Sequence, residues 1–245
     1  MKRLFRTAAR QPADTRRYGR GWVRATVATF GAVVLARTFA VQVYGISSPS
    51  MRNTLHPGDY VITSGLPFGT AIPGTRWSTP RFRDPRRGEV VVYGEKPGDP
   101  PARIIKRVIG GPGDTVRMVD GRVIRNGRTL DEPYASPILL DDEPLAFDGP
   151  YGVAWHLAAL PAGVSATGYR PTRDRWGPLV IPPGHYLLLG DDRDGSRDSR
   201  YTGFIAREQI RGKVYRIYYS VAPQKNRFPR ALTAARWSRI GDRVD

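Results

Sequence analysis

Residues 103–109 read Arg-Ile-Ile-Lys-Arg-Val-Ile and run directly into Gly110-Gly-Pro-Gly113. A short apolar run rich in β-branched residues and closed by a turn signal is typical of a β-strand. Alternate residues of a strand face opposite sides, so either Lys106 or Arg107 is expected to face the core. The stretch therefore predicts a buried strand that carries a cation into the interior.

Runs of the same kind occur on both sides of this strand. Asp120-Gly121 separates two of them and is a strong hairpin signal, and Asn126-Gly127 marks a second turn. Helical spacing is weak in this part of the chain, so the fold class that we predict is mostly β. The other expected strands are 59–63, 89–93, 115–119, 122–125, 185–189 and 213–219.

Three segments interrupt or follow this pattern. Residues 66–86 are rich in Pro, Gly and Arg and are expected to be a surface insertion. Residues 135–178 are long, aromatic and rich in Pro and Gly, which favours a small irregular subdomain or loop. Residues 223–245 form a basic C-terminal tail that is expected to lie on the protein body or on an anionic membrane. The β-rich domain itself is predicted to span 45–222.

The composition limits the chemistry. The 245 residues include 39 Lys and Arg against 22 Asp and Glu, for a net charge of +17, and no cysteine. Disulfides and thiolate metal sites are therefore excluded. The strong positive charge fits a partner such as nucleic acid or an anionic membrane surface. Eight basic residues lie within 1–24, where Asp14 is the one acid.

An apolar segment follows this basic start. Residues 22–44 are long enough for a helix that crosses a bilayer, with Trp22 and Tyr44 at the ends. Arg37 lies near the far end, where its side chain can reach the headgroups. We predict a basic cytoplasmic tail over 1–21 and a transmembrane helix, with the rest of the chain outside the cytoplasm. The alternatives are a cleaved signal peptide, for which no clear Ala-x-Ala site follows, and a buried soluble helix.

A group of hydroxyls lies just beyond this segment, in Ile46-Ser-Ser-Pro-Ser-Met51. A serine becomes a useful nucleophile only when a base takes its proton. The histidines fall in no motif of a Ser-His-Asp or zinc site, and arginine does not release its proton. The three histidines are His56, His156 and His185.

Lysine is the remaining candidate base. Of the few lysines, Lys106 lies inside an apolar strand, where burial would lower its pKa from about 10.4. A decrease of roughly 2–3 units would make it a workable general base. The strand pattern alone leaves open a lysine that merely extends its ammonium group to solvent.

Four blocks of sequence occur in order behind the predicted membrane segment. They are residues 48–55 (Ser-Pro-Ser-Met-Arg-Asn-Thr-Leu), residues 57–61 (Pro-Gly-Asp-Tyr-Val), residues 87–92 together with 105–114, and residues 183–200. Together they resemble the bacterial type I signal peptidases, a family of membrane-bound Ser/Lys endopeptidases. The resemblance implies a β-rich catalytic domain on the outer face of the cell membrane, behind a single anchor with a cytoplasmic N-terminus. It also implies secretory preproteins as substrates, with small residues at positions −1 and −3. Neither a cofactor, a metal, nucleic acid nor an obligate protein partner is expected.

The resemblance also implies residue roles. Ser50 matches the nucleophile and Lys106 the general base, while Ser48 matches a side-chain oxyanion donor that acts with the Ser50 backbone N–H. The hydroxyl that orients the lysine corresponds to Ser196, and Asp198 and Arg200 correspond to a supporting ion pair. Shallow apolar substrate pockets are expected from Ile46, Met51, Leu55 and Ile105.

The sequence departs from the family pattern at four positions. Pro49 stands where glycine is usual and Ser47 where proline is usual, and Asp192 and Gly195 replace asparagines. Pro49 lacks a backbone N–H and restricts the residue before it to extended geometry. This makes the oxyanion role of Ser48 the least secure of these roles.

The sequence is also compatible with three other functions. A self-cleaving Ser/Lys repressor would share the dyad but need a DNA-binding helical domain, for which residues 1–44 offer no helix-turn-helix. A non-enzymatic basic membrane protein that binds nucleic acid or anionic lipid would account for the charge. A peptidase dedicated to a pilin or conjugation protein would carry the same motifs as a general enzyme.

Overall fold

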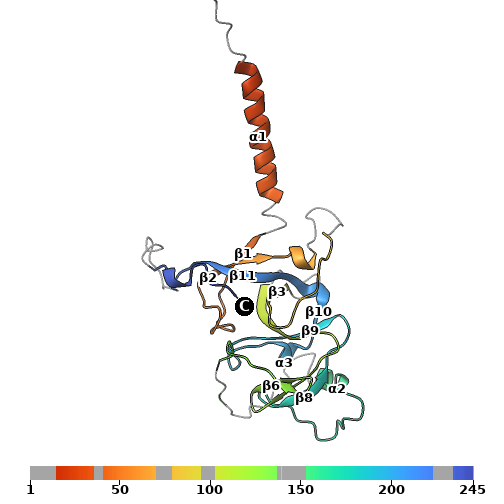
Figure 1. Ribbon diagram of the computed structural model, residues 1–245. Coiled ribbons are helices and arrows are strands. Elements are labelled where there is room, and N and C mark those ends of the chain that lie inside the picture. Colours follow the sequence, from red (N-terminus) through yellow and green to blue (C-terminus); the bar gives the residue numbers. More distant parts are fainter. Residues whose placement is uncertain are drawn as a thin grey trace, which may run out of the picture.

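β-sheets dominate the computed structural model, which describes residues 15–35, 41–69, 79–94, 103–136, 139, 153–222 and 234–244. Two sheets make up the body, and helix α1 (Thr15–Leu35) projects from one end of it (Figure 1). The prediction of a mostly β fold is confirmed.

The larger sheet has seven strands in the order β1-β2-β11-β3-β4-β9-β10. Every pairing between its described strands is antiparallel. Strand β4, which lies between β3 and β9, is formed by the apolar stretch that carries Lys106 and Arg107. The strands are β1 (Gln42–Gly45), β2 (Asp59–Ser64), β3 (Val90–Gly94), β4 (Arg103–Gly110), β9 (His185–Leu189), β10 (Ile205–Ala206) and β11 (Ile210–Ser220).

The smaller sheet has the order β7-β6-β5-β8. Its two hairpin turns are the predicted ones. Asp120 and Gly121 both have positive φ, at 49° and 74°, as do Asn126 and Gly127, at 51° and 78°. This is the geometry of a two-residue hairpin loop, which Asp-Gly and Asn-Gly adopt at low cost. The strands are β5 (Thr115–Val119), β6 (Arg122–Arg125), β7 (Arg128–Thr129) and β8 (Trp176–Val180).

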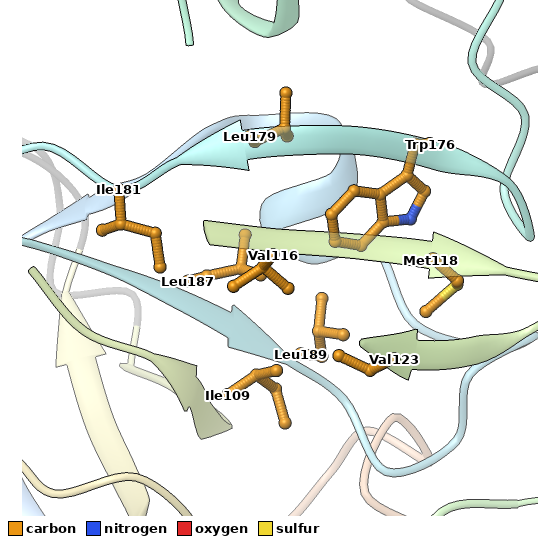
Figure 2. Packing of buried hydrophobic residues seen from close by; sticks show 9 residues of the cluster. All are labelled: Ile109, Val116, Met118, Val123, Trp176, Leu179, Ile181, Leu187 and Leu189. Carbon is orange, nitrogen blue, oxygen red and sulfur yellow. The ribbon is translucent and has the colours of Figure 1, made fainter. Parts of the chain in front are cut away.

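Two apolar clusters matter for the site. One joins the small sheet to β9 and the end of β4 (Figure 2). The other lies beneath the serine-rich segment and unites strands β2, β3 and β11. Its fully buried members are Met51, Leu55, Val61, Val90, Val92, Val214, Ile217 and Val244.

Both predicted insertions contain packed structure. Strand β8 begins at Trp176, inside the segment expected to be irregular, and α2 (Ala154–Ala158) places His156 in the interior. Strand β8 was not predicted because it contains Gly177 and Pro178, and both residue types are uncommon inside strands. In the first insertion the short helix η2 (Leu66–Phe68) buries Phe68. Residues 70–78, 137–138 and 140–152 lie outside the described residues.

The prediction of one helix over residues 22–44 is wrong. Helix α1 starts earlier and ends at Leu35, and residues 42–45 form β1, which pairs with β2. Within the described part of the chain, no helix combines the length and apolar character needed to span a bilayer. The first half of α1 carries four arginines, and its uncharged stretch from residue 25 to 35 extends only about 16 Å. Residues 36–40 lie outside the described residues.

Candidate active site

Ser50 lies in a tight turn, residues 49–55, that leads from β1 to β2 and is called the nucleophile turn after the role predicted for Ser50. The turn is closed by hydrogen bonds from the N–H of Arg52 to the carbonyl of Pro49 (2.8 Å) and from the N–H of Leu55 to that of Met51 (2.6 Å). Ser50 is 8% exposed. Its side chain is therefore held at the surface end of the apolar cluster that Met51 and Leu55 enter.

Lys106 lies opposite Ser50, on β4. Its Nζ is 2.5 Å from the Ser50 Oγ, although the two residues are far apart in the sequence. Alternation led us to expect only one of Lys106 and Arg107 inside, but both are buried, at 3% and 1% exposure. The strand is covered on both faces, which is why adjacent residues can both be buried.

The surroundings of Lys106 favour its neutral form. Burial lowers the pKa of Lys106 below its usual value, and the charge of Arg200 lowers it further. The charges of Asp198, Asp191 and Asp192 act in the opposite direction, but the net change is a decrease. A neutral Nζ within hydrogen-bond reach of a hydroxyl can accept its proton, which is the geometry of a general base and its nucleophile.

The two predicted oxyanion donors face one another. The backbone N–H of Ser50 donates to the Oγ of Ser48, 3.3 Å away. Ser48 is exposed, and the residue between the two serines is Pro49, which has no N–H to offer. For both groups to bind an oxyanion, this long hydrogen bond has to open.

Ser196 is buried near the dyad, at 4% exposure, but its Oγ has no hydrogen-bond partner within the described structure. The expected bond from Ser196 to Lys106 is therefore not formed here. Gly190 explains how closely this region packs. A Cβ at Gly190 would lie 2.2 Å from the Ser196 Oγ and 2.5 Å from the Ser50 carbonyl oxygen. Sequence reasoning did not identify this glycine.

Asp198 and Arg200 form a fully buried ion pair. The Nε of Arg200 is 2.9 Å from one carboxylate oxygen of Asp198 and its Nη2 is 3.0 Å from the other. Asp198 also accepts the N–H of Gly190 at 2.9 Å. Burial raises the pKa of Asp198, but the charge and hydrogen bonds of Arg200 outweigh this and leave the pKa lowered. The pair thus fixes the end of β9 to the segment that carries Ser196.

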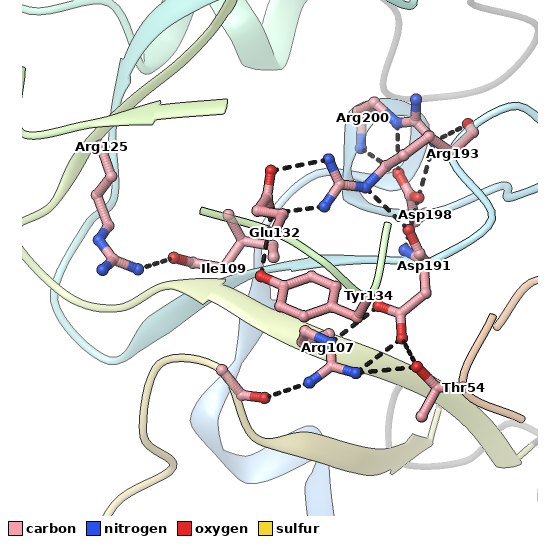
Figure 3. A network of polar contacts seen from close by, with 12 residues as sticks. Thr54, Arg107, Ile109, Arg125, Glu132, Tyr134, Asp191, Arg193, Asp198 and Arg200 are labelled. Atoms are coloured by element: carbon pink, nitrogen blue, oxygen red, sulfur yellow. Dashed lines mark hydrogen bonds and ion pairs between the residues drawn. The ribbon is translucent and has the colours of Figure 1, made fainter. Parts of the chain in front are cut away.

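A second buried ion pair lies under the nucleophile turn (Figure 3). Arg107 donates to both oxygens of Asp191, at 2.9 and 2.8 Å, and each residue is about 1% exposed. The hydroxyl of Thr54, in the nucleophile turn, donates to the same carboxylate at 2.5 Å. One carboxylate therefore connects the turn of the serine to the strand of the lysine.

This network continues away from the dyad. The guanidinium of Arg107 stacks 3.8 Å above the ring of Tyr134, whose hydroxyl donates to Glu132. Glu132 pairs with Arg193 at 2.6 Å, and Arg193 donates to the carbonyl of Gly190 (Figure 3). Sequence analysis missed these residues, because their partners are distant in the chain and share no spacing pattern.

A cleft of about 350 Å³ opens beside the dyad. Residues 45–48, 50 and 51 line it together with residues 103–106, and Gly195 and Arg197 complete the lining. Of the predicted pocket residues, Ile46, Met51 and Ile105 line the cleft. Leu55 does not, because it is fully buried in the cluster below.

One wall of the cleft is an unpaired strand edge. Strand β4 pairs with β3 along residues 103–107, but its pairing with β9 begins only at Arg107. Residues 103–106 therefore present a free edge to the cleft. An extended peptide can add to such an edge through backbone hydrogen bonds. Among the described residues, no group of three His, Asp or Glu side chains could hold a metal ion.

Comparison with known proteins gives consistent matches. Residues 19–219 match the family described as signal peptidase, peptidase S26. The chain is 33% identical over 201 residues to signal peptidase I of Pseudomonas fluorescens, covering 77% of this chain and 68% of that protein. It is 32% identical over 227 residues to signal peptidase I of Pseudomonas aeruginosa, covering 85% and 74%. A solved signal peptidase I from Enterococcus faecalis matches 54% of this chain and 97% of that one at 26% identity, with a TM-score of 0.34.

Proposed function

The chain belongs to the signal peptidase family, peptidase S26, and is a serine endopeptidase; on that premise we propose that it removes signal peptides from preproteins with a Ser50–Lys106 dyad. The observation that carries the dyad is the 2.5 Å contact between the Ser50 Oγ and the Nζ of a buried lysine whose pKa is lowered. No other described lysine lies as deep.

The steps follow from this contact. Neutral Lys106 takes the proton of Ser50 as the Oγ attacks the scissile carbonyl. The tetrahedral intermediate collapses to an acyl-enzyme, and Lys106 returns the proton to the leaving amine of the mature protein. Lys106 then takes a proton from water, which attacks the ester, and passes it to the Ser50 Oγ as the signal peptide leaves. This chemistry needs neither a metal nor an organic cofactor.

The Ser50 N–H and the Ser48 hydroxyl are the proposed oxyanion donors. They are now joined by a 3.3 Å hydrogen bond, which is long and therefore weak. An oxyanion that binds between them exchanges this weak bond for two charge-assisted ones, which are stronger. Ser196, Asp198 and Arg200 are proposed to hold the lysine side of the site in place.

The substrate is proposed to be a secretory preprotein in extended form along the free edge of β4. Ile46, Met51 and Ile105 supply the apolar floor of the cleft, which fits small side chains at positions −1 and −3. The reaction requires no nucleic acid and no obligate protein partner.

We propose that α1 and the residues after it attach the enzyme to the cell membrane, with the N-terminus in the cytoplasm and the catalytic body outside. On this helix, the side chains of Trp22, Val27 and Phe30 are 75%, 66% and 69% exposed. An apolar surface of this kind is unfavourable in water and is typical of a site that contacts a membrane or a partner. The arginines that precede them fit the cytoplasmic side. Single-cysteine labelling can test the orientation, because the chain has no cysteine of its own.

The test of the dyad is cleavage of a purified preprotein by Ser50→Ala and Lys106→Ala variants. Each is expected to lower kcat by about 10⁴-fold or more, as loss of one member of such a unit does. Ser165→Ala and Lys213→Ala are the matched controls, since neither residue lines the cleft. Activity of either dyad variant within tenfold of the controls would refute the assignment.

A further inference from the structure

The end of the chain reaches the nucleophile turn. Residues 234–244, the C-terminal strap, run along β11: the N–H of Arg236 donates to Ser220, and those of Gly241 and Val244 donate to Ile217 and Tyr215. Val244 is 1% exposed and belongs to the same apolar cluster as Met51 and Leu55. The strap therefore packs against the layer that supports Ser50.

The strap is fixed at a buried carboxylate. Asp59, the first residue of β2, is fully buried and accepts the Nη2 of Arg239 at 2.6 Å and of Arg236 at 3.0 Å. It also accepts the hydroxyl of Ser220 at 2.7 Å and the backbone N–H of His56 at 2.8 Å. Two arginines of the strap thus neutralise a charge at the point where the nucleophile turn enters β2.

Both arginines of the strap also donate to main-chain carbonyls. The Nη2 of Arg236 donates to the carbonyl of Pro57 at 2.9 Å, and the Nη2 of Arg239 donates to that of Thr54 at 3.0 Å. The hydroxyl of Thr54 is held from the other direction by Asp191, the partner of Arg107. Thr54 is therefore fixed by its main chain to the strap and by its side chain to the strand that carries Lys106.

We propose that Arg239 and Asp59 are positioning residues for catalysis. Through them, the C-terminal strap holds the nucleophile turn in the position at which the Ser50 Oγ is within hydrogen-bond distance of the Lys106 Nζ. This inference rests on the proposed dyad and assigns to the strap a role beyond stability. A planar guanidinium can bridge a carboxylate and a carbonyl, whereas an ammonium group on a flexible stem cannot hold both in one geometry. Displacement of a nucleophile by about 1 Å can cost about 100-fold in rate.

The experiment compares Arg239→Ala, Arg239→Lys and Arg243→Ala in the full chain, with a preprotein as substrate and below the melting temperature of every variant. Arg243 is the matched control, because it is an exposed arginine of the same strap that contacts neither Asp59 nor Thr54. Arg239→Ala is expected to lower kcat at least tenfold with KM within twofold, and Arg239→Lys to restore only part of kcat. Arg243→Ala should match the unmodified enzyme.

Amide hydrogen exchange gives a second readout that does not depend on activity. Exchange in residues 51–57 is expected to increase in Arg239→Ala and to stay unchanged in Arg243→Ala. A kcat for Arg239→Ala within twofold of the Arg243→Ala control, or full kcat in Arg239→Lys, would overturn the proposal. Failure of the dyad itself would be recognised separately, because Ser50→Ala and Lys106→Ala would then retain activity whatever happens at Arg239.

Discussion

The carbonyl oxygen of Ser50 accepts a hydrogen bond from the backbone N–H of Asp192 at 3.1 Å. This bond joins the nucleophile turn to the loop that follows β9, two segments that meet only in the folded chain. Gly190 stands at the same junction, between the Ser50 carbonyl and Ser196. The precision of the site therefore depends on how closely two backbones approach.

Gly190→Ala is expected to damage both stability and activity. The new methyl group would lie 2.5 Å from a backbone oxygen that the Asp192 bond holds in place, so the clash cannot be relieved by a side-chain rotation. We expect a loss of about 1–3 kcal/mol in the free energy of unfolding, as for other overpacked sites, and at least a tenfold lower kcat. Urea unfolding and preprotein cleavage measure the two effects.

Gly111→Ala is the control for this prediction. A Cβ there would meet only the ring of Tyr186 at 3.5 Å, an ordinary contact. If Gly190→Ala were as active and as stable as Gly111→Ala, the close approach of the two segments would not exist in solution.

The pH dependence of the enzyme should follow Lys106, and the charge of Asp192 should modulate it. Lys106 acts in its neutral form, so kcat/KM should fall as the pH drops below the pKa of Lys106, which burial places below the usual value of lysine. The negative charge of Asp192 raises that pKa. Asp192→Asn removes the charge but keeps the backbone N–H, so the acidic limb of the profile should move to lower pH. A shift to higher pH would contradict the role of Lys106 as base.

The sequence predicted the part of the site that lies on strand β4. It did not predict the part that depends on ion pairs between residues far apart in the chain. Lys106 was recognisable because it interrupts an apolar strand, and both hairpins because Asp-Gly and Asn-Gly accept positive φ. Asp59 and Arg239 form an ion pair although most of the chain separates them in sequence, and no local sequence pattern predicts such a pair. The transmembrane prediction failed at its far end because Val43 and Tyr44 of β1 continue the apolar run of residues 38–41, so the sequence does not mark where the strand begins.

The ion pair between Arg107 and Asp191 should be among the most sensitive in the molecule. Both side chains are buried, so Arg107→Met leaves an uncompensated carboxylate, which typically costs about 3–5 kcal/mol. The exposed pair of Arg175 and Asp120 is the comparison, and Arg175→Ala should cost less than about 1 kcal/mol. Equal losses in the two variants would show that burial does not govern the first pair.

His156 should make the fold sensitive to mild acid. Burial lowers the pKa of His156 from 6.5 to about 4, so the folded protein binds fewer protons than the unfolded chain between those values. Stability is therefore fully present above about pH 6.5, decreases as the pH falls through this window, and levels off below about pH 4. The expected decrease from this residue is about 3 kcal/mol.

Urea unfolding between pH 7 and 4 measures this effect. The slope of stability against pH should be smaller in His156→Gln than in the unmodified protein. An identical slope in His156→Gln would mean that the histidine is not held neutral in the folded state.

Ser48 gives the sharpest test of the oxyanion site, because Pro49 and the Ser48–Ser50 hydrogen bond both bear on it. If the Ser48 hydroxyl turns to the oxyanion during the reaction, its contribution appears in the transition state and not in substrate binding. Ser48→Ala should then lower kcat by about 10²–10³-fold with KM nearly unchanged, as loss of one oxyanion donor does. Ser48→Thr keeps the hydroxyl and should remain within tenfold of the unmodified enzyme. Ser47→Ala is the control, because it removes the neighbouring hydroxyl in the same cleft. If Ser48→Ala were as active as Ser47→Ala, Ser48 would have no part in catalysis, and the backbone N–H of Ser50 would be the remaining donor.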